Sequence, residues 1–201
     1  EALQNLLYAE EKHALLVILQ GMDASGKDGA IKNVFEPVNP IGCKVIAFKK
    51  PSELELKHDF LWRIHQEVPE KGMMGIFNRS HYEDVLIQQI NNFEKMLVDN
   101  GTIVLKFYLH VSKEEQLQRL NERLNDTSKM WKHNENDILE RKLWSQYMKC
   151  YEDVFTNCST GAEWNIIPSD QNWYKEFLIT KKIVETLEAL KMKFPDLKKE
   201  K

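Results

Sequence analysis

The feature that most constrains the fold is a series of short apolar stretches that alternate with longer helical patterns. The first stretch, 13–20, is apolar throughout its middle, which is typical of a parallel strand buried on both faces. Further stretches of this kind lie at 44–48, 73–77, 102–109 and 164–167. Strands that alternate with helices predict an α/β fold, here a parallel five-stranded sheet flanked by helices.

Helical patterns separate the expected strands. They cover 29–36, 53–68, 82–100, 113–125, 135–156 and 173–193, and residues 1–12 are interpreted as the end of a further helix. A chain of 201 residues is long enough for one sizeable core and too short for two. We therefore expect a single domain over 1–201.

The charge balance restricts the partners. The 28 Lys and Arg residues nearly match the 31 Asp and Glu residues, which argues against a basic nucleic-acid coat protein. A polyanionic partner must therefore meet a local cluster of cations. The longest apolar run, 14–19, is too short to span a bilayer, so we expect no membrane partner. The three cysteines have no CxxC spacing, and the sequence shows no signal-peptide pattern. We therefore expect free thiols in a reducing compartment, and hence a cytoplasmic location.

A phosphate-binding loop follows the first expected strand. The sequence Gly21-Met-Asp-Ala-Ser-Gly26-Lys27 matches the pattern G-x-x-x-x-G-K and lies between a strand and a helix, as this motif requires. Glycines let several backbone N–H groups point at one anion, and the start of the helix adds the positive end of its dipole. A turn that merely joins strand and helix is the alternative. We expect the phosphate-binding residues to be Ala24, Ser25, Gly26, Lys27, Asp28 and Gly29.

Asp28 distinguishes this loop from that of an ordinary GTPase. The position after the loop lysine normally carries Ser or Thr, whose hydroxyl binds Mg²⁺. A carboxylate is a stronger ligand for a hard cation but repels phosphate, so Asp28 and the nearby Asp23 indicate Mg²⁺ between acid and phosphate. We expect Mg²⁺ as the cofactor, with Mn²⁺ as a substitute ion. Asp28 can also cap the helix, and the two roles are compatible.

A polar cluster follows the third expected strand. Asn78 takes the place where P-loop proteins carry an acid for Mg²⁺, and Glu83 and Asp84 follow within about one and a half helical turns. Arg79 emerges at the same sheet edge as the phosphate loop, where it can neutralise charge on a transferred phosphoryl group. Ser80 and Glu83 also fit a capping box, but a cap leaves Asn78 and Arg79 unexplained.

The segment after the second expected strand is a candidate for acceptor binding. In P-loop nucleotide kinases the acceptor nucleotide lies across this region. Lys49 and Arg63 are candidate contacts to its phosphate, and Asp59 is a candidate for holding metal or acceptor groups. With the residues of the third strand, the expected nucleotide-binding set is Lys49, Asp59, Arg63, Asn78, Arg79 and Glu83.

We expect a lid over about 119–142. Basic residues outnumber acidic residues there by only one, so a solvated helical face is the alternative. Lids that close over phosphates supply cations and exclude water, which suppresses competing hydrolysis. The candidate cations are Arg119, Arg123, Lys129 and Lys132.

Together these motifs resemble the type-2 polyphosphate kinases. The matching segments run over nearly the whole chain and include GMDASGKDG, FKKPS, HDFLWR, GIFNRSHYEDVL and EWNIIP, with 126–132 in the lid. The resemblance implies a thymidylate-kinase-like P-loop core with a helical lid. It implies a magnesium and transfer site made of Asp23, Lys27, Asp28, Arg79 and Glu83, and four lid cations that grip polyphosphate.

The branch with Asn before Arg-Ser, here Asn78, implies an acceptor range of both nucleoside mono- and diphosphates. The implied reaction moves the terminal phosphoryl group of inorganic polyphosphate to AMP or ADP, reversibly, in line and without a covalent enzyme intermediate. The implied partners are polyphosphate, AMP, ADP and ATP, with guanine nucleotides as further acceptors. The resemblance also implies that the protein forms a homo-oligomer. Family members usually have a longer connection after Leu86, so the join at Ile90–Asn91 is either a true deletion or a loop closed up in the numbering.

Other functions fit the same motifs. An ATP-dependent nucleoside monophosphate kinase has the same fold, and a nucleotide-binding module without transferase activity has the same loop. Asp28 in place of Ser or Thr counts against both. A polyphosphate-binding structural protein is the weakest alternative, because two acids lie in the loop.

Overall fold

The computed structural model describes residues 1–84, 87–127, 130–132 and 135–196, without the side chains of residues 83, 84, 132, 135 and 136. The strands within these ranges are β1 (Ala14–Gln20), β2 (Cys43–Ala47), β3 (Met74–Asn78), β4 (Thr102–His110) and β5 (Trp164–Pro168). They form one parallel sheet in the order β2-β3-β1-β4-β5. The prediction of a parallel five-stranded sheet is confirmed, and every strand begins and ends within one residue of its predicted bounds.

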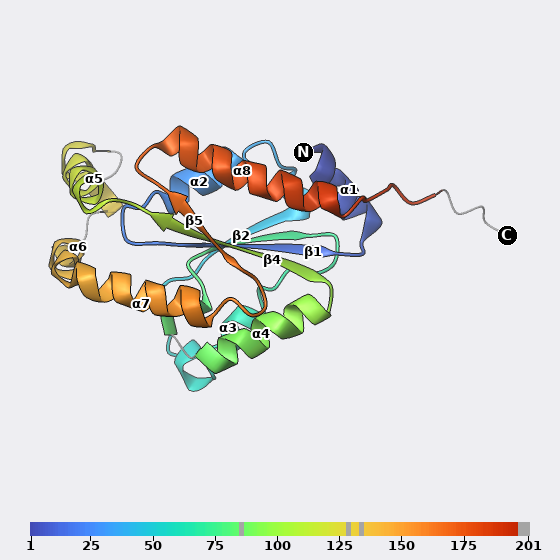
Figure 1. The fold of residues 1–201 in the computed structure, drawn as a ribbon, viewed down its shortest axis with the longest axis horizontal. Helices are drawn as coiled ribbons and strands as arrows, with labels where there is room; N and C mark the ends of the chain where they lie inside the picture. Colours follow the sequence, from blue (N-terminus) through green and yellow to red (C-terminus); the bar gives the residue numbers. More distant parts are fainter. Residues whose placement is uncertain (85–86, 128–129, 133–134, 197–201) are drawn as a thin grey trace.

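Helices cover both faces of this sheet. The α-helices of the described ranges are α1 (Ala2–Glu10), α2 (Lys27–Phe35), α3 (Trp62–His65), α4 (Ile87–Asp99), α5 (Lys113–Asn125), α6 (Glu135–Glu140), α7 (Trp144–Asn157) and α8 (Asn172–Ala189). Figure 1 shows α1, α2 and α8 on one face, and α3, α4 and α7 on the other. α5 and α6 lie beyond the carboxyl ends of the strands, where the sequence predicts a lid (Figure 1).

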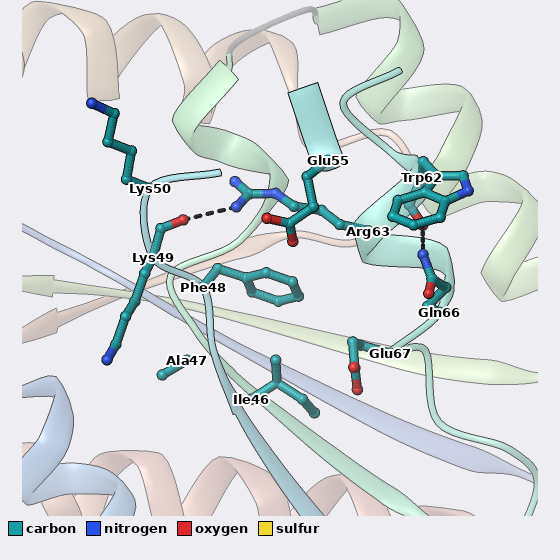
Figure 2. Close-up of a pocket in the computed structure, with 10 residues that line it drawn as sticks. All are labelled: Ile46, Ala47, Phe48, Lys49, Lys50, Glu55, Trp62, Arg63, Gln66 and Glu67. Atoms are coloured by element: carbon teal, nitrogen blue, oxygen red, sulfur yellow. Dashed lines mark hydrogen bonds between the residues drawn. The ribbon is translucent and has the colours of Figure 1, made fainter. Parts of the chain in front are cut away.

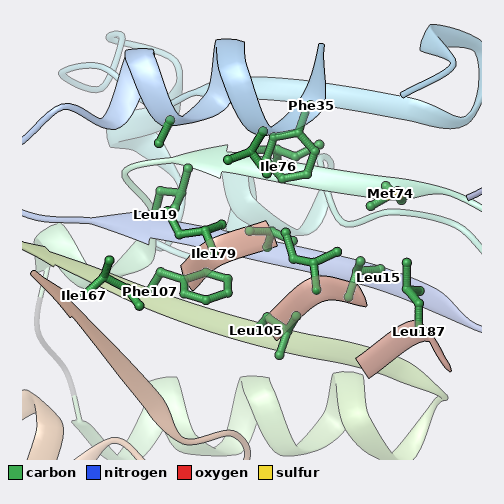
Figure 3. Packing of buried hydrophobic residues seen from close by; sticks show 14 of the residues in the cluster. Leu15, Leu19, Phe35, Met74, Ile76, Leu105, Phe107, Ile167, Ile179 and Leu187 are labelled. Atoms are coloured by element: carbon green, nitrogen blue, oxygen red, sulfur yellow. The ribbon is translucent and has the colours of Figure 1, made fainter. Parts of the chain in front are cut away.

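The core consists of two apolar layers, one on each face of the sheet. Alternate residues of β1 point to opposite faces, as in any strand. Leu15 and Leu19 pack on the side of α8, with Ile179 and Leu187 (Figure 3). Leu16, Ile18, Phe77, Phe93 and Leu97 form the layer on the side of α4. Because both faces are covered, all seven residues of β1 are buried, which explains the uniformly apolar sequence of this strand.

Two predicted helices are interrupted in the structure. The continuous helix predicted over 53–68 is wrong, because this segment contains only the 3-10 turn η2 (Glu55–Lys57) and the short α3. The Asp59 carboxylate accepts the backbone N–H of Leu61 at 2.9 Å, and this local turn competes with a continuous helix. The helix predicted over 135–156 is divided into α6, the 3-10 turn η5 (Arg141–Leu143) and α7. Here the Arg141 guanidinium donates to the carbonyl of Lys113 at the start of α5, at 2.5 Å.

The segment after β3 begins with the 3-10 turn η3 (His81–Asp84), and α4 begins only at Ile87, not at residue 82 as predicted. α4 continues through Ile90–Asn91 without a break. None of the described helices combines the length and the apolar character that a bilayer-spanning helix requires.

Candidate active site

The strand order brings the two polar motifs together. β1 and β3 are neighbours, with Leu19 paired to Asn78, so the phosphate loop and the turn after β3 leave the sheet side by side. This is the carboxyl edge of the sheet, where ligands of open α/β folds bind. The loop continues directly into α2, whose first residue is Lys27. The predicted strand–loop–helix arrangement is therefore present.

The phosphate loop requires glycine at its last position. Gly26 has φ 91°, in the left-handed region that residues with a Cβ rarely adopt. Lys27 turns back over the loop, and its Nζ donates to the carbonyls of Gly21 at 2.7 Å and Met22 at 3.1 Å. Lys27 is only 8 % exposed. The ammonium group of Lys27 therefore packs against the phosphate loop that precedes it.

Two hydrogen-bonded pairs connect the phosphate loop to the turn after β3. An Arg79 guanidinium nitrogen lies 2.8 Å from Asp23 Oδ1, and the amide nitrogen of Asn78 donates to Asp28 Oδ1 at 2.9 Å. Arg79 has φ 64°, and its backbone N–H donates to the carbonyl of Leu19 at 3.0 Å. A non-glycine residue in this conformation is strained, and such strain clusters at functional sites. The structure thus brings Asp23, Asp28, Asn78 and Arg79 into one cluster.

The donor set of this cluster fits a magnesium ion. Mg²⁺ is usually bound by one or two carboxylates together with phosphate oxygens and water. Asp23 and Asp28 supply two carboxylates beside the loop that would hold the phosphates. Within the described ranges, no three His, Cys, Asp or Glu side chains come together as a protein-only metal cage. The side chain of Glu83, which the sequence assigns to the same site, lies outside the described residues.

The lid cations that the structure describes are held by protein groups. Arg119 lies against the phosphate loop and donates to the carbonyl of Ala24 at 3.2 Å and to that of Ser169 at 2.8 Å. Arg123 pairs with Asp137 of α6 at 3.3 Å. Lys129 and the side chain of Lys132 lie outside the described residues. Polyphosphate binding by these four cations therefore stays a prediction.

A pocket of about 280 Å³ lies beside the end of β2 (Figure 2). Lys49 and Arg63 meet there, because the Arg63 guanidinium donates to the carbonyl of Lys49 at 2.8 Å. The same guanidinium lies 5.5 Å from the centre of the Phe48 ring. Figure 2 shows the side chains of Lys49 and Lys50 extending outward at the rim. Asp59 does not line this pocket, and its carboxylate holds the turn before α3. Contact of these residues with a nucleotide stays a prediction.

A buried polar cluster behind η3 was missed from the sequence. Lys106 of β4 donates to Glu94 at 2.6 Å, to the Tyr82 hydroxyl at 2.9 Å and to the carbonyl of Cys158 at 2.6 Å. His81 and Glu94 lie 3.5 Å apart. The one signal in the sequence is the lysine in the middle of an apolar strand, since a buried ammonium needs a buried partner.

The cluster holds its groups in fixed protonation states. Burial lowers the pKa of His81, which keeps the imidazole neutral against the opposing effect of Glu94. Burial raises the pKa of Glu94, but the nearby His81 imidazole and the charge of Lys106 outweigh it, so the net shift is downward. Burial and the Glu94 charge raise the pKa of the Tyr82 phenol. Tyr82 and His81 belong to η3, so the cluster ties this turn to α4, to β4 and to the end of α7.

A family model, curated relatives and a solved structure that resemble this chain all carry names of polyphosphate kinases or polyphosphate phosphotransferases. The model of the family described as Polyphosphate kinase 2 (PPK2) matches residues 1–195. An AMP/ADP-polyphosphate phosphotransferase from Meiothermus ruber is 50% identical over 212 residues, which cover 97% of this chain and 79% of the relative. An ADP-polyphosphate phosphotransferase from Rhodopseudomonas palustris is 40% identical over 223 residues, 96% of this chain and 77% of the relative. The crystal structure of Polyphosphate Kinase 2 from Arthrobacter aurescens TC1 superposes with a TM-score of 0.95 at 38% identity, and the match covers 100% of this chain and 78% of that one.

Proposed function

This chain belongs to the polyphosphate kinase 2 family, and we propose that it transfers the terminal phosphoryl group of inorganic polyphosphate to AMP and ADP. Transferase activity with polyphosphate as the donor follows from the family. The further proposals concern the acceptor range, the residues that act and the metal ion. The observation that supports them most strongly is the direct contact between the phosphate loop and the turn after β3, through Asp23–Arg79 and Asp28–Asn78.

The main task of the site is to bring two polyanions together. The second proton of a phosphate monoester is largely lost at pH 7, since its pKa is about 6, so the acceptor needs no strong general base. Coulomb repulsion opposes the approach of the donor chain to this acceptor. Lys27 and Arg79 lie at the junction of the two loops, and their charges offset the repulsion and stabilise the transferred group. A loose transition state needs little beyond such positioning and charge.

Asp23 and Asp28 are the residues that would hold Mg²⁺, or Mn²⁺ in its place. When bound, the ion would supply further positive charge to the phosphate oxygens. Arg79 and Asn78 have a second role here, because each donates to one of the two carboxylates and so fixes its orientation. The Asp23–Arg79 pair also keeps the guanidinium beside the phosphate loop.

The acceptor is proposed to bind on the β2 side of Arg79, next to the pocket at Lys49 and Arg63. β2 and β3 are neighbours, so this pocket and the turn after β3 lie at the same edge of the sheet. Guanine nucleotides as further acceptors, a homo-oligomeric assembly and a cytoplasmic location are parts of the same proposal. The reaction is reversible with ADP, because donor and product both contain phosphoanhydride bonds.

The proposal is tested by analysis of the nucleotides formed from polyphosphate. The protein is mixed with Mg²⁺, long-chain polyphosphate and either AMP or ADP, without added ATP, and the products are separated by ion-exchange chromatography. We expect ATP from ADP, and ADP followed by ATP from AMP. A parallel reaction with chelator in excess over Mg²⁺ is expected to give no product.

Other outcomes would change the proposed acceptor range or the proposed phosphoryl donor. Product from ADP alone would restrict the acceptor range to diphosphates. Absence of product with polyphosphate, together with ADP formation from ATP and AMP, would identify an ATP-dependent monophosphate kinase and contradict the proposal.

A further inference from the structure

The carbonyl groups of the phosphate loop are all held by hydrogen bonds. Each carbonyl from Gly21 to Gly26 accepts at least one side-chain donor, and most of these donors come from segments far away in the sequence. The donors are the side chains of Lys27, Gln116, Arg119, Ser169 and Lys175. The loop therefore does not keep its shape through glycine alone. It is fixed by contacts with α5 and with the segment that joins β5 to α8.

The orientation of a carbonyl determines the orientation of the neighbouring N–H. In a trans peptide the C=O and the N–H point in opposite directions. The carbonyl of Gly26 accepts the backbone N–H of Ala30 at 3.0 Å and the ammonium group of Lys175 at 3.3 Å, so the N–H of the same peptide, which belongs to Lys27, points to the other side. That N–H lies at the start of α2, where the helix dipole favours an anion. Lys175 thus helps Ala30 to orient a donor of the anion site, and it adds a charge behind this peptide without facing the anion itself.

Lys175 is in close contact with the loop. Its side chain is fully buried, and its Nζ also donates to the amide oxygen of Asn172 at 2.8 Å. A Cβ atom at Gly26 would lie 2.5 Å from this Nζ, so the absence of a side chain at Gly26 is what makes room for the ammonium group.

The charge of Lys175 lacks a carboxylate partner. Among the described residues it forms no ion pair, and its hydrogen bonds go to neutral oxygens of Gly26 and Asn172. The charged groups that act on it are Arg119 of α5, which repels it, and Glu176 of α8, which attracts it. Burial and then Arg119 lower the pKa of Lys175 to about 8. A buried cation without a counter-ion is costly, and an anion bound in the adjacent loop would relieve that cost.

We propose that Lys175 is a positioning residue for the polyphosphate donor, which fixes the phosphate loop from behind and contributes positive charge to the anion site. The inference rests on the proposed function, because it assumes that polyphosphate binds in this loop. Lys175 acts through the peptide of Gly26 and through its charge, not by contact with the phosphate. Its effect therefore concerns the donor and not the acceptor nucleotide.

The test compares Lys175→Met with Lys175→Arg. The methionine keeps much of the side-chain volume but removes the donor and the charge, whereas the arginine keeps both. Lys181→Met is the matched control, because Lys181 lies on the same helix but is exposed.

Measurements are the equilibrium binding of polyphosphate without nucleotide, the KM values for polyphosphate and ADP, and thermal unfolding. We expect Lys175→Met to weaken polyphosphate binding and raise its KM about tenfold, with the KM for ADP nearly unchanged. We expect the affinity of Lys175→Arg for polyphosphate and its KM for polyphosphate to lie within about threefold of the wild-type values.

A pH series keeps the inference testable if the methionine variant does not fold. Lys175 is charged below its pKa of about 8 and loses its charge as the pH rises through that value. Polyphosphate binding by the wild type should therefore weaken above about pH 8, and Lys175→Arg should abolish this change, since arginine stays charged. Equal polyphosphate binding by folded Lys175→Met and wild type, or the same pH profile for Lys175→Arg and wild type, would overturn the inference. Failure of the wild type to bind or use polyphosphate would instead overturn the proposed function.

Discussion

At the scale of residues, Lys27 is the side chain of the phosphate loop that we propose to act on the donor. Its ammonium group lies on two carbonyls of its own loop, at 2.7 Å and 3.1 Å, and is nearly buried. A phosphate in the loop would offer this ammonium charged oxygens in place of neutral ones, and hydrogen bonds to charged acceptors are stronger. Lys27 therefore stabilises the fold of the loop, and in the proposed function it also binds the donor.

We expect Lys27→Ala to reduce kcat for ATP formation from polyphosphate and ADP by at least about a hundredfold, because the transition state loses a full charge at the transferred group. Lys32→Ala is the control, since Lys32 is exposed near the end of the same helix. Circular dichroism and thermal unfolding check that both variants are folded. Near-normal turnover of Lys27→Ala would remove this lysine from the transfer site.

Gly26 and Gly29 provide a matched pair for the geometry of the loop. Gly26→Ala places a Cβ at φ 91° and 2.5 Å from Lys175 Nζ, so we expect a loss of stability of about 1–2 kcal/mol or more. Gly29 lies in α2, and a Cβ added there would have no atom within 4 Å. For Gly29→Ala we therefore expect no loss of stability, and a gain of up to about 1 kcal/mol. Urea unfolding of the two variants measures the difference. Equal stabilities would contradict the described loop conformation.

Some residues of the candidate site could be proposed from the sequence and others could not. Asp23, Lys27, Asp28, Asn78 and Arg79 were predictable, because a sequence motif places them at the ends of two adjacent strands. Lys175 was not predictable, since it is 149 positions from Gly26, and a lysine in an amphipathic helix is normally solvated. Only the packing of α8 against the phosphate loop gives it a role.

At the scale of elements, the turn after β3 is held by the buried cluster around Lys106. Tyr82 donates to Glu94 at 2.5 Å, and Lys106 bridges Glu94 to the carbonyl of Cys158 at the end of α7. Lys106 and Glu94 both have fully buried side chains. The segment that carries Arg79 is therefore connected to the helix that follows the lid region.

We expect Glu94→Leu to destabilise the protein by about 3–5 kcal/mol, because it leaves the Lys106 ammonium buried without its partner. The double variant Glu94→Leu/Lys106→Met removes both charges, and we expect it to recover at least half of the lost stability. Urea unfolding measures all three proteins. A single variant as stable as the wild type, or a double variant less stable than the single one, would contradict the ion pair described here.

Strands were more predictable than helices. The three central strands β1, β3 and β4 are mostly buried, so their apolar sequences are direct consequences of their positions in the sheet, whereas most residues of the edge strands β2 and β5 are half-buried or exposed. The segments 53–68 and 135–156 have helical periodicity, but contacts of Asp59 and Arg141 decide where each helix begins and ends. The Arg141 contact depends on the tertiary structure and the Asp59 contact is a local turn, and hydrophobic periodicity predicts neither of them. The lid over 119–142 stays a prediction, and part of it lies outside the described residues.

For the whole molecule, one parallel sheet with covered faces presents a single carboxyl edge to its substrates. The phosphate loop, the turn after β3 and the pocket beside β2 follow three adjacent strands along that edge. This order places the proposed donor and acceptor on either side of Arg79. The family to which the chain belongs supports polyphosphate, rather than ATP, as the phosphoryl donor, and Asp28 in place of Ser or Thr agrees with this.

The most direct test of this claim is a competition between the two donors. AMP with a tritiated adenine is incubated with the protein, Mg²⁺, ³²P-labelled polyphosphate and unlabelled ATP, and the ³²P in the β-phosphate of the tritiated ADP is measured at early times. Our account predicts that the β-phosphate carries nearly the specific radioactivity of the polyphosphate, and that Arg79→Ala loses this transfer while its thermal unfolding remains cooperative. Formation of tritiated ADP without ³²P by the wild type, or of doubly labelled ADP at a near-normal rate by Arg79→Ala, would contradict it.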